Sequence, residues 1–121
     1  MAKILVVDDQ ESTGNLIALV LGENHTVFEA RNGAEGLLEF ENHNPDLVIT
    51  DLDMPVMNGI EMVRRVRALS REVKIIAYST FHRRGSRAEM LSAGADLCLM
   101  KPGSLKTLEE AVANILSSNK T

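Results

Sequence analysis

The chain has 121 residues with a formal net charge of -4 at pH 7, and 45% of its residues are hydrophobic. This length and composition predict one globular domain over residues 1–121 with its own core, and they exclude a disordered chain. The acidic balance argues against direct binding of nucleic acid, and a single cysteine cannot form an internal disulfide, which fits a reducing cytoplasm. No stretch resembles a signal peptide or is apolar over the thickness of a membrane, so we expect a cytoplasmic protein without membrane contacts.

Short apolar runs alternate with amphipathic segments along the whole chain. In chain order the pattern predicts strand 3–7, helix 12–22, strand 26–30, a helix that starts at Asn32-Gly33 and ends before Pro45, strand 46–50, helix 59–69, strand 73–78, helix 86–93, strand 96–100 and helix 104–117. Ser12 and Ser104 are candidate N-caps, and Gly22 and Gly94 are expected to end the first and fourth helices.

Five strands alternating with five helices predict an α/β fold. The strands are continuous apolar runs, which is typical of a parallel sheet covered by helices on both faces. The crossovers between them are expected to be right-handed, as in doubly wound sheets. In the third helix Arg64, Arg65 and Arg67 stand between the apolar positions, and we expect them to form a solvated face.

Charged residues follow three of the predicted strands at the point where each strand ends. Asp8-Asp9 follow the first strand, Asp51 follows the third, and Lys101-Pro102 follow the fifth. Because ligands and chemistry collect outside the carboxyl ends of the strands in open α/β sheets, we expect these side chains to form one site.

The residue types favour phosphoryl chemistry at this site. An aspartate carboxylate can attack a phosphorus centre and form an acyl phosphate. Three neighbouring carboxylates repel one another, and Mg²⁺ is a suitable counter-ion because it binds carboxylate, water and phosphate oxygens. Lys101 can balance charge on a phosphoryl oxygen, and the hydroxyl of Ser79 can donate a hydrogen bond to another.

The same residues carry a family resemblance. Asp8-Asp9, the run Asp51–Gly59 (DLDMPVMNG), Ser79 and Lys101-Pro102 resemble the receiver domain of two-component response regulators, in particular the chemotaxis-regulator type. The resemblance extends from about residue 3 to residue 117. It implies a flavodoxin-like fold with strand order 2-1-3-4-5.

The resemblance also assigns a role to each matching position. Asp51 is the expected phosphoacceptor, and Ser79 and Lys101 are expected to hold the phosphoryl group. Asp9 is expected to bind Mg²⁺ directly and Asp8 directly or through water. The backbone carbonyl of Asp53 is a further expected metal ligand, beside the Asp51 carboxylate. Pro102 is expected to follow a cis peptide bond.

The function implied by the resemblance is a phosphorylation-dependent signalling switch rather than an enzyme. Its expected partners are a sensor histidine kinase or phosphotransfer protein, and a downstream target or output domain that contacts residues 85–117. A homodimer that forms on phosphorylation is also expected of this family. No DNA-binding or catalytic output domain fits in 121 residues, so the chain is either a stand-alone regulator or part of a longer protein.

Two other functions remain open from the sequence. Asp51-x-Asp53 also resembles the nucleophile motif of haloacid-dehalogenase phosphatases, although that motif expects threonine or valine where Pro55 stands. A receiver-like interaction module that is not phosphorylated is the other alternative, and the complete acidic set argues against it.

The chain departs from the family pattern close to the site. Cys98 stands three residues before the lysine, where receivers usually carry a tyrosine or phenylalanine that swings inward on activation. A thiol cannot act as an aromatic switch, and we expect Cys98 to be a packed apolar residue. Thr80, Phe81 and the Asp53 carboxylate are expected to hinder water, which predicts slow self-dephosphorylation.

Overall fold

The computed structural model describes residues 1–117 and confirms the predicted α/β architecture. Its elements run in the order β1 (Lys3–Val7), α1 (Glu11–Leu21), β2 (Thr26–Ala30), α2 (Gly33–His43), β3 (Leu47–Thr50), α3 (Gly59–Leu69), β4 (Lys74–Ser79), α4 (Ser86–Ala93), β5 (Leu97–Met100) and α5 (Leu105–Ser117). The five strands form one parallel sheet in the order β2-β1-β3-β4-β5. Among the described residues, no helix has both the length and the apolar character needed to cross a membrane.

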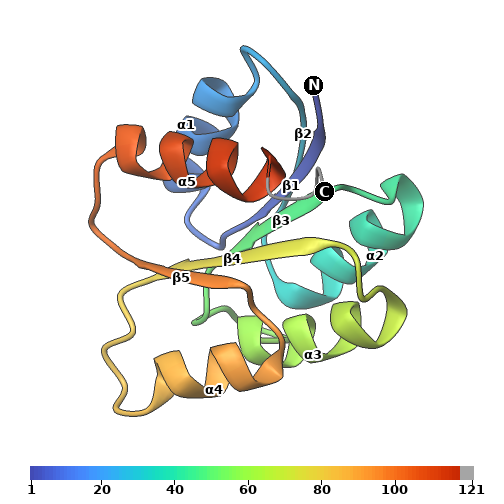
Figure 1. The fold of residues 1–121 in the computed structure, drawn as a ribbon. Helices are drawn as coiled ribbons and strands as arrows, with labels where there is room; N and C mark the ends of the chain where they lie inside the picture. The colour runs from blue at the N-terminus through green and yellow to red at the C-terminus, as the bar shows by residue number, and fades with distance from the viewer. Residues whose placement is uncertain (118–121) are drawn as a thin grey trace.

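Helices cover both faces of the sheet, as Figure 1 shows, with α1 and α5 on one face and α2, α3 and α4 on the other. Each face has its own hydrophobic core. Leu5, Val48 and Ile75 belong to the core under α2, α3 and α4, whereas Ile4 and Ile49 belong to the core under α1 and α5. Because all four residues of β3 are buried, a polar residue that follows this strand emerges at the carboxyl edge of the sheet.

Most predicted element boundaries agree with the structure to within one residue, and two details differ. Ser12 lies inside α1 and does not cap it, because the helix starts at Glu11 with Gln10 in the N-cap position. The Asp8 carboxylate accepts a hydrogen bond from the Gln10 N–H at 2.9 Å, which closes a turn between β1 and the start of α1. The fourth strand extends one residue beyond the prediction and includes Ser79.

The other predicted caps are confirmed. The Ser104 hydroxyl accepts a hydrogen bond from the Thr107 N–H at 3.0 Å, which satisfies a free donor in the first turn of α5. Gly22 and Gly94 occupy the C-cap positions of α1 and α4. Gly94 has a φ of 129°, a value that side-chain-bearing residues rarely adopt, so this end of α4 requires glycine.

The prediction of a solvated arginine face is correct for Arg64 and Arg65 and wrong for Arg67. The Arg67 side chain is only 21% exposed and forms an ion pair with Asp96 at 3.0 Å. Its guanidinium also donates to the carbonyl oxygens of Gly94 at 2.7 Å and of Val73 at 2.7 Å. Arg67 therefore ties the end of α3 to the end of α4 and to the segments that enter β4 and β5.

Candidate functional site

The carboxyl edge of the sheet brings the predicted charged residues together. Asp8, Asp9 and Asp51 each offer a carboxylate oxygen, and these oxygens all lie within 4.8 Å of one another. The Lys101 Nζ atom lies 2.6 Å from Asp8 Oδ2 and 3.2 Å from Asp51 Oδ2. Residues 93 positions apart in the sequence thus meet at one point, as their positions at the strand ends predict.

Backbone hydrogen bonds hold these residues in place because the sheet pairing continues past the ends of the strands. The Asp8 N–H donates to the Ala30 carbonyl oxygen at 3.0 Å, and the Asp51 N–H donates to the Val7 carbonyl oxygen at 2.9 Å. The Lys101 N–H donates to the Ser79 carbonyl oxygen at 2.9 Å. The backbone of these charged residues is therefore hydrogen-bonded to the sheet, which fixes the positions from which their side chains extend.

The start of α3 lies directly against the backbone of Asp51. The Gly59 N–H donates to the Leu52 carbonyl oxygen at 2.8 Å. A Cβ atom at position 59 would collide with the Asp51 carbonyl oxygen, which is backbone and cannot move aside. The glycine at the end of the DLDMPVMNG run is therefore required by this close approach, which fixes the turn that carries Asp51.

The donor set of the acidic cluster fits a small divalent cation. Asp8 is 2% exposed and the Asp51 side chain is 12% exposed, whereas Asp9 is open to solvent. Carboxylate oxygens are the ligands that Mg²⁺ prefers, and the exposed side of the cluster leaves room for water or phosphate oxygens in its shell. The Asp53 side chain is exposed and lines one cavity together with Asp9 and Asp51.

A cavity of about 200 Å³ opens beside the cluster, and its lining residues are Asp9, Gln10, Asp51, Asp53, Thr80 and Lys101. Because one water molecule occupies about 30 Å³ in the liquid, this volume accommodates a phosphoryl group and a few waters. Polar and charged groups line it, which suits an ionic ligand rather than an apolar one.

Lys101 is held as a cation by its carboxylate partners. Burial alone would lower its pKa, but the hydrogen bond to Asp8 and the charges of Asp51 and Asp8 outweigh burial, so the Lys101 pKa is raised above its ordinary value. Since a raised folded-state pKa favours the charged form, the pairing stabilises the fold fully at neutral pH. This stabilisation is lost only as pH rises above the unfolded-state pKa near 10.4 and through the folded-state value. The Lys101-Pro102 peptide bond is cis, as expected.

Ser79 lies at the same edge, and it is not among the residues that line the cavity. It is the last residue of β4, pairs with Met100 of β5, and is 1% exposed. Its neighbour Thr80 lines the cavity instead. The Phe81 side chain packs against the core under α2, α3 and α4 and is not among the lining residues of the cavity.

Sequence reasoning missed two features of the loops around the cavity. His82 Nδ1 lies 3.1 Å from the Thr80 hydroxyl and 3.6 Å from the Asp53 carboxylate, so it links the loops that follow β4 and β3. Val56 has a φ of 69° and a side chain turned to solvent. The sequence signals neither feature, because both depend on the path of the loop backbone.

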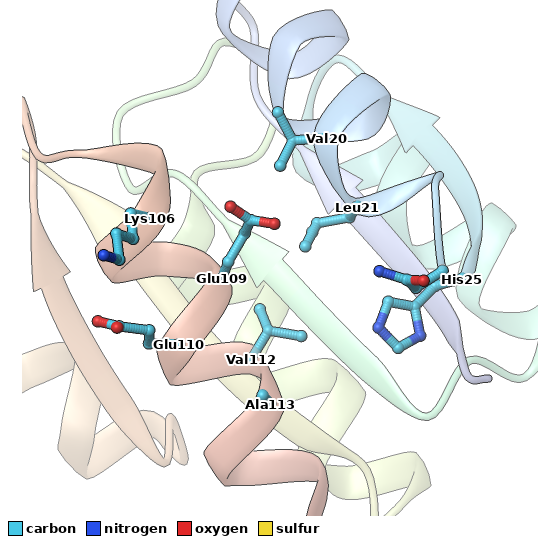
Figure 2. Close-up of a pocket in the computed structure, with 9 residues that line it drawn as sticks. Val20, Leu21, His25, Lys106, Glu109, Glu110, Val112 and Ala113 are labelled. Atoms are coloured by element: carbon cyan, nitrogen blue, oxygen red, sulfur yellow. The ribbon is translucent and has the colours of Figure 1, made fainter.

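A second cavity lies between α1 and α5, and Figure 2 shows its lining side chains. Its volume is about 340 Å³, and Leu21 and Val112 lie at its base, with Glu109, Glu110 and Lys106 on the α5 side. Its lining residues do not include a lysine that is paired with two carboxylates, as Lys101 is paired with Asp8 and Asp51. Among the described residues, the carboxylate cluster with its lysine lies at the smaller cavity at the sheet edge.

Comparison with known proteins decides the family. The family model of the response regulator receiver domain matches residues 4–113 of this chain. The chain belongs to the receiver domain family. Receiver domains are signalling domains of two-component systems, and this assignment agrees with the strand order and with the resemblance seen in the sequence.

Relatives of this receiver domain occur as short proteins and as parts of longer ones. It is 31% identical to the chemotaxis protein CheY of Halobacterium salinarum over 120 residues, which cover 98% of this chain and all of the relative. It is 36% identical to the KDP operon transcriptional regulatory protein KdpE of Escherichia coli over 110 residues, which cover 90% of this chain and 48% of KdpE.

The receiver domain also resembles solved structures over nearly its whole length. The crystal structure of a CheY-like response regulator receiver domain protein from Methanospirillum hungatei superposes with a TM-score of 0.93 at 28% identity. The similarity covers 98% of this chain and 95% of that protein. The arrangement of strands and helices described above is thus that of the family.

Proposed function

We propose that this receiver domain is a phosphorylation-dependent switch that accepts a phosphoryl group on Asp51 from a phosphohistidine. The observation that carries the proposal is the placement of Lys101 Nζ between Asp8 and Asp51, beside three carboxylates within 4.8 Å of one another. The donor is a sensor histidine kinase or a phosphotransfer protein. Membership of the receiver family supports this function.

The chain's own residues account for the transfer step. An Asp51 carboxylate oxygen attacks phosphorus, the bond from phosphorus to the histidine nitrogen breaks, and the imidazole keeps the electron pair. Lys101 stabilises the negative charge on the phosphoryl oxygens, because its ammonium already lies 3.2 Å from Asp51. Mg²⁺ held by Asp8, Asp9, Asp51 and the Asp53 carbonyl would supply further charge neutralisation.

Ser79 is the proposed link between the site and the rest of the molecule. Ser79 is 1% exposed and is not among the lining residues of the cavity, so contact of its hydroxyl with a phosphoryl group would involve a movement of the loop after β4. That loop leads into α4, and residues 85–117 then form the proposed surface for a target, an output domain or a second copy. A partner that binds one loop position better than the other converts phosphorylation into a signal.

Cys98 does not contribute an aromatic switch to this link. It is buried in the core under α2, α3 and α4, and burial raises the pKa of its thiol. Its backbone carbonyl accepts a hydrogen bond from Arg87 of α4 at 3.5 Å. The coupling that we propose therefore runs through the backbone of the loop after β4 and through α4.

The proposed function is tested by following intact mass after incubation with acetyl phosphate. With Mg²⁺ we expect the chain to gain one phosphoryl group, and with a chelator in place of Mg²⁺ we expect no gain. The same sample should not turn over a phosphate ester such as p-nitrophenyl phosphate. Steady turnover of that ester would favour the haloacid-dehalogenase-like phosphatase, and gain of mass without metal would contradict the magnesium part of the proposal.

We also propose that the phosphorylated form is long-lived because Thr80 and Asp53 line the cavity that water must cross. Replacing Thr80 with alanine removes a methyl and a hydroxyl group from that path. We expect the rate of phosphoryl loss to rise by a factor of roughly three to ten, which corresponds to about 1 kcal/mol in the barrier. Thr26→Ala, at the opposite end of the sheet, is the control; equal lifetimes in the two variants would remove the steric explanation.

A further inference from the structure

Val56 occupies a strained turn in the loop between β3 and α3. The Met57 N–H donates to the Pro55 carbonyl oxygen at 2.7 Å, which closes a three-residue turn with Val56 at its centre. The φ of Val56 is 69°, a region that β-branched residues adopt only at a steric cost. Glycine or asparagine would make the same turn with less strain.

The Val56 side chain does not offset this strain by packing against the rest of the fold. Val56 is 84% exposed, whereas its loop neighbours Met54 and Met57 pack against the core under α2, α3 and α4. The backbone of the turn is held in place by Met57, whose carbonyl oxygen accepts a hydrogen bond from the Gly33 N–H at 2.9 Å. A rigid turn thus presents an apolar side chain to solvent, and strain of this kind concentrates at functional sites.

The turn lies next to the phosphorylation cavity. Val56 follows Asp53, which lines the cavity, by three residues, so their Cα atoms are at most about 11 Å apart. A small phosphodonor that enters the cavity does not need the Val56 side chain, whereas a protein that reaches Asp51 must cover the rim around the cavity.

From this geometry we propose that Val56 is an apolar contact for the protein that presents the phosphohistidine. The partner surface beside the histidine is accordingly apolar, and burial of Val56 in the encounter selects protein donors that carry such a surface. This inference rests on the proposed phosphorylation of Asp51. It adds to the proposed function that the phosphodonor protein has an apolar surface beside its histidine.

The test compares a small donor with a protein donor on the same variants. Purified histidine phosphotransfer domains are phosphorylated and screened, and the domain that phosphorylates the wild-type chain fastest serves as the probe beside acetyl phosphate. In Val56→Asn we expect the rate with acetyl phosphate to stay within about twofold of wild type. We expect kcat/KM with the protein donor to fall about fivefold or more, through a higher KM.

Leu69→Asn is the matched control, because Leu69 is another exposed apolar residue, at the far end of α3. It should change neither rate, and Val56→Asn should unfold at the same temperature as wild type or higher. Unchanged transfer from the protein donor in Val56→Asn would overturn the inference, and so would an equal loss with both donors, which would indicate a structural role. Failure of the wild type with every donor would instead overturn the proposed function.

Discussion

Replacing Arg67 with methionine is expected to lower the free energy of unfolding by about 3 kcal/mol, because several partly buried carbonyl groups lose a charged donor. The guanidinium of Arg67 donates to the carbonyl oxygens of Gly94 and Val73 and pairs with Asp96. It also reaches the carbonyl oxygens of Ser70 at 3.3 Å and Arg71 at 3.1 Å. Methionine keeps much of the side-chain volume but none of these donors.

Urea denaturation of Arg67→Met and of Arg64→Met measures this effect against a control on the same helix. The Arg64 side chain is 54% exposed and forms an ion pair with Glu61 at 3.7 Å. Exposed pairs of this kind contribute little, so the control should stay within about 0.5 kcal/mol of wild type. If both variants unfolded at the same urea concentration, the hydrogen bonds of Arg67 would not have the stabilising role assigned to them.

The second large effect is expected at Lys101. Replacing it with methionine removes the ammonium that lies 2.6 Å from Asp8 and 3.2 Å from Asp51. Loss of a charged group that stabilises a transition state typically lowers a rate by about 100-fold or more, and we expect the rate of phosphorylation by acetyl phosphate to fall by that factor. The rate is followed by intact mass at saturating Mg²⁺.

Lys106→Met is the control for the change of charge, because Lys106 lies on α5 beside the other cavity. It should be phosphorylated at the wild-type rate. Circular dichroism of Lys101→Met with Mg²⁺ present establishes that the variant is folded. A folded Lys101→Met that is phosphorylated within about threefold of the wild-type rate would contradict the role assigned to this lysine.

The fold and the centre of the site could be predicted from local patterns in the sequence. Apolar runs of strand length, with Pro and Gly between them, locate β3 and β5, and parallel strands place the residues after their carboxyl ends at one edge. Asp51 and Lys101 meet there because the sheet pairing continues one residue past each strand. Their proximity could therefore be predicted from the strand order, without any knowledge of long-range packing.

The features that the sequence did not reveal all depend on tertiary contacts. Arg67 is similar to its neighbours Arg64 and Arg65 in the helical pattern, and its role as a partly buried donor depends on contacts with the end of α4. The strain at Val56 requires the loop backbone, which Gly33 fixes from α2. Side-chain periodicity carries no information about either contact.

Phosphorylation of Asp51 is tested most directly by intact mass of the wild type, Asp51→Asn and the control Glu41→Gln after incubation with acetyl phosphate and Mg²⁺. Glu41 is an exposed carboxylate on α2, outside the site. We expect the wild type and Glu41→Gln to gain the mass of one phosphoryl group and Asp51→Asn to gain none. An adduct on Asp51→Asn as large as that on the wild type would contradict the assignment, and so would a wild type that stays unmodified by both acetyl phosphate and phosphoramidate.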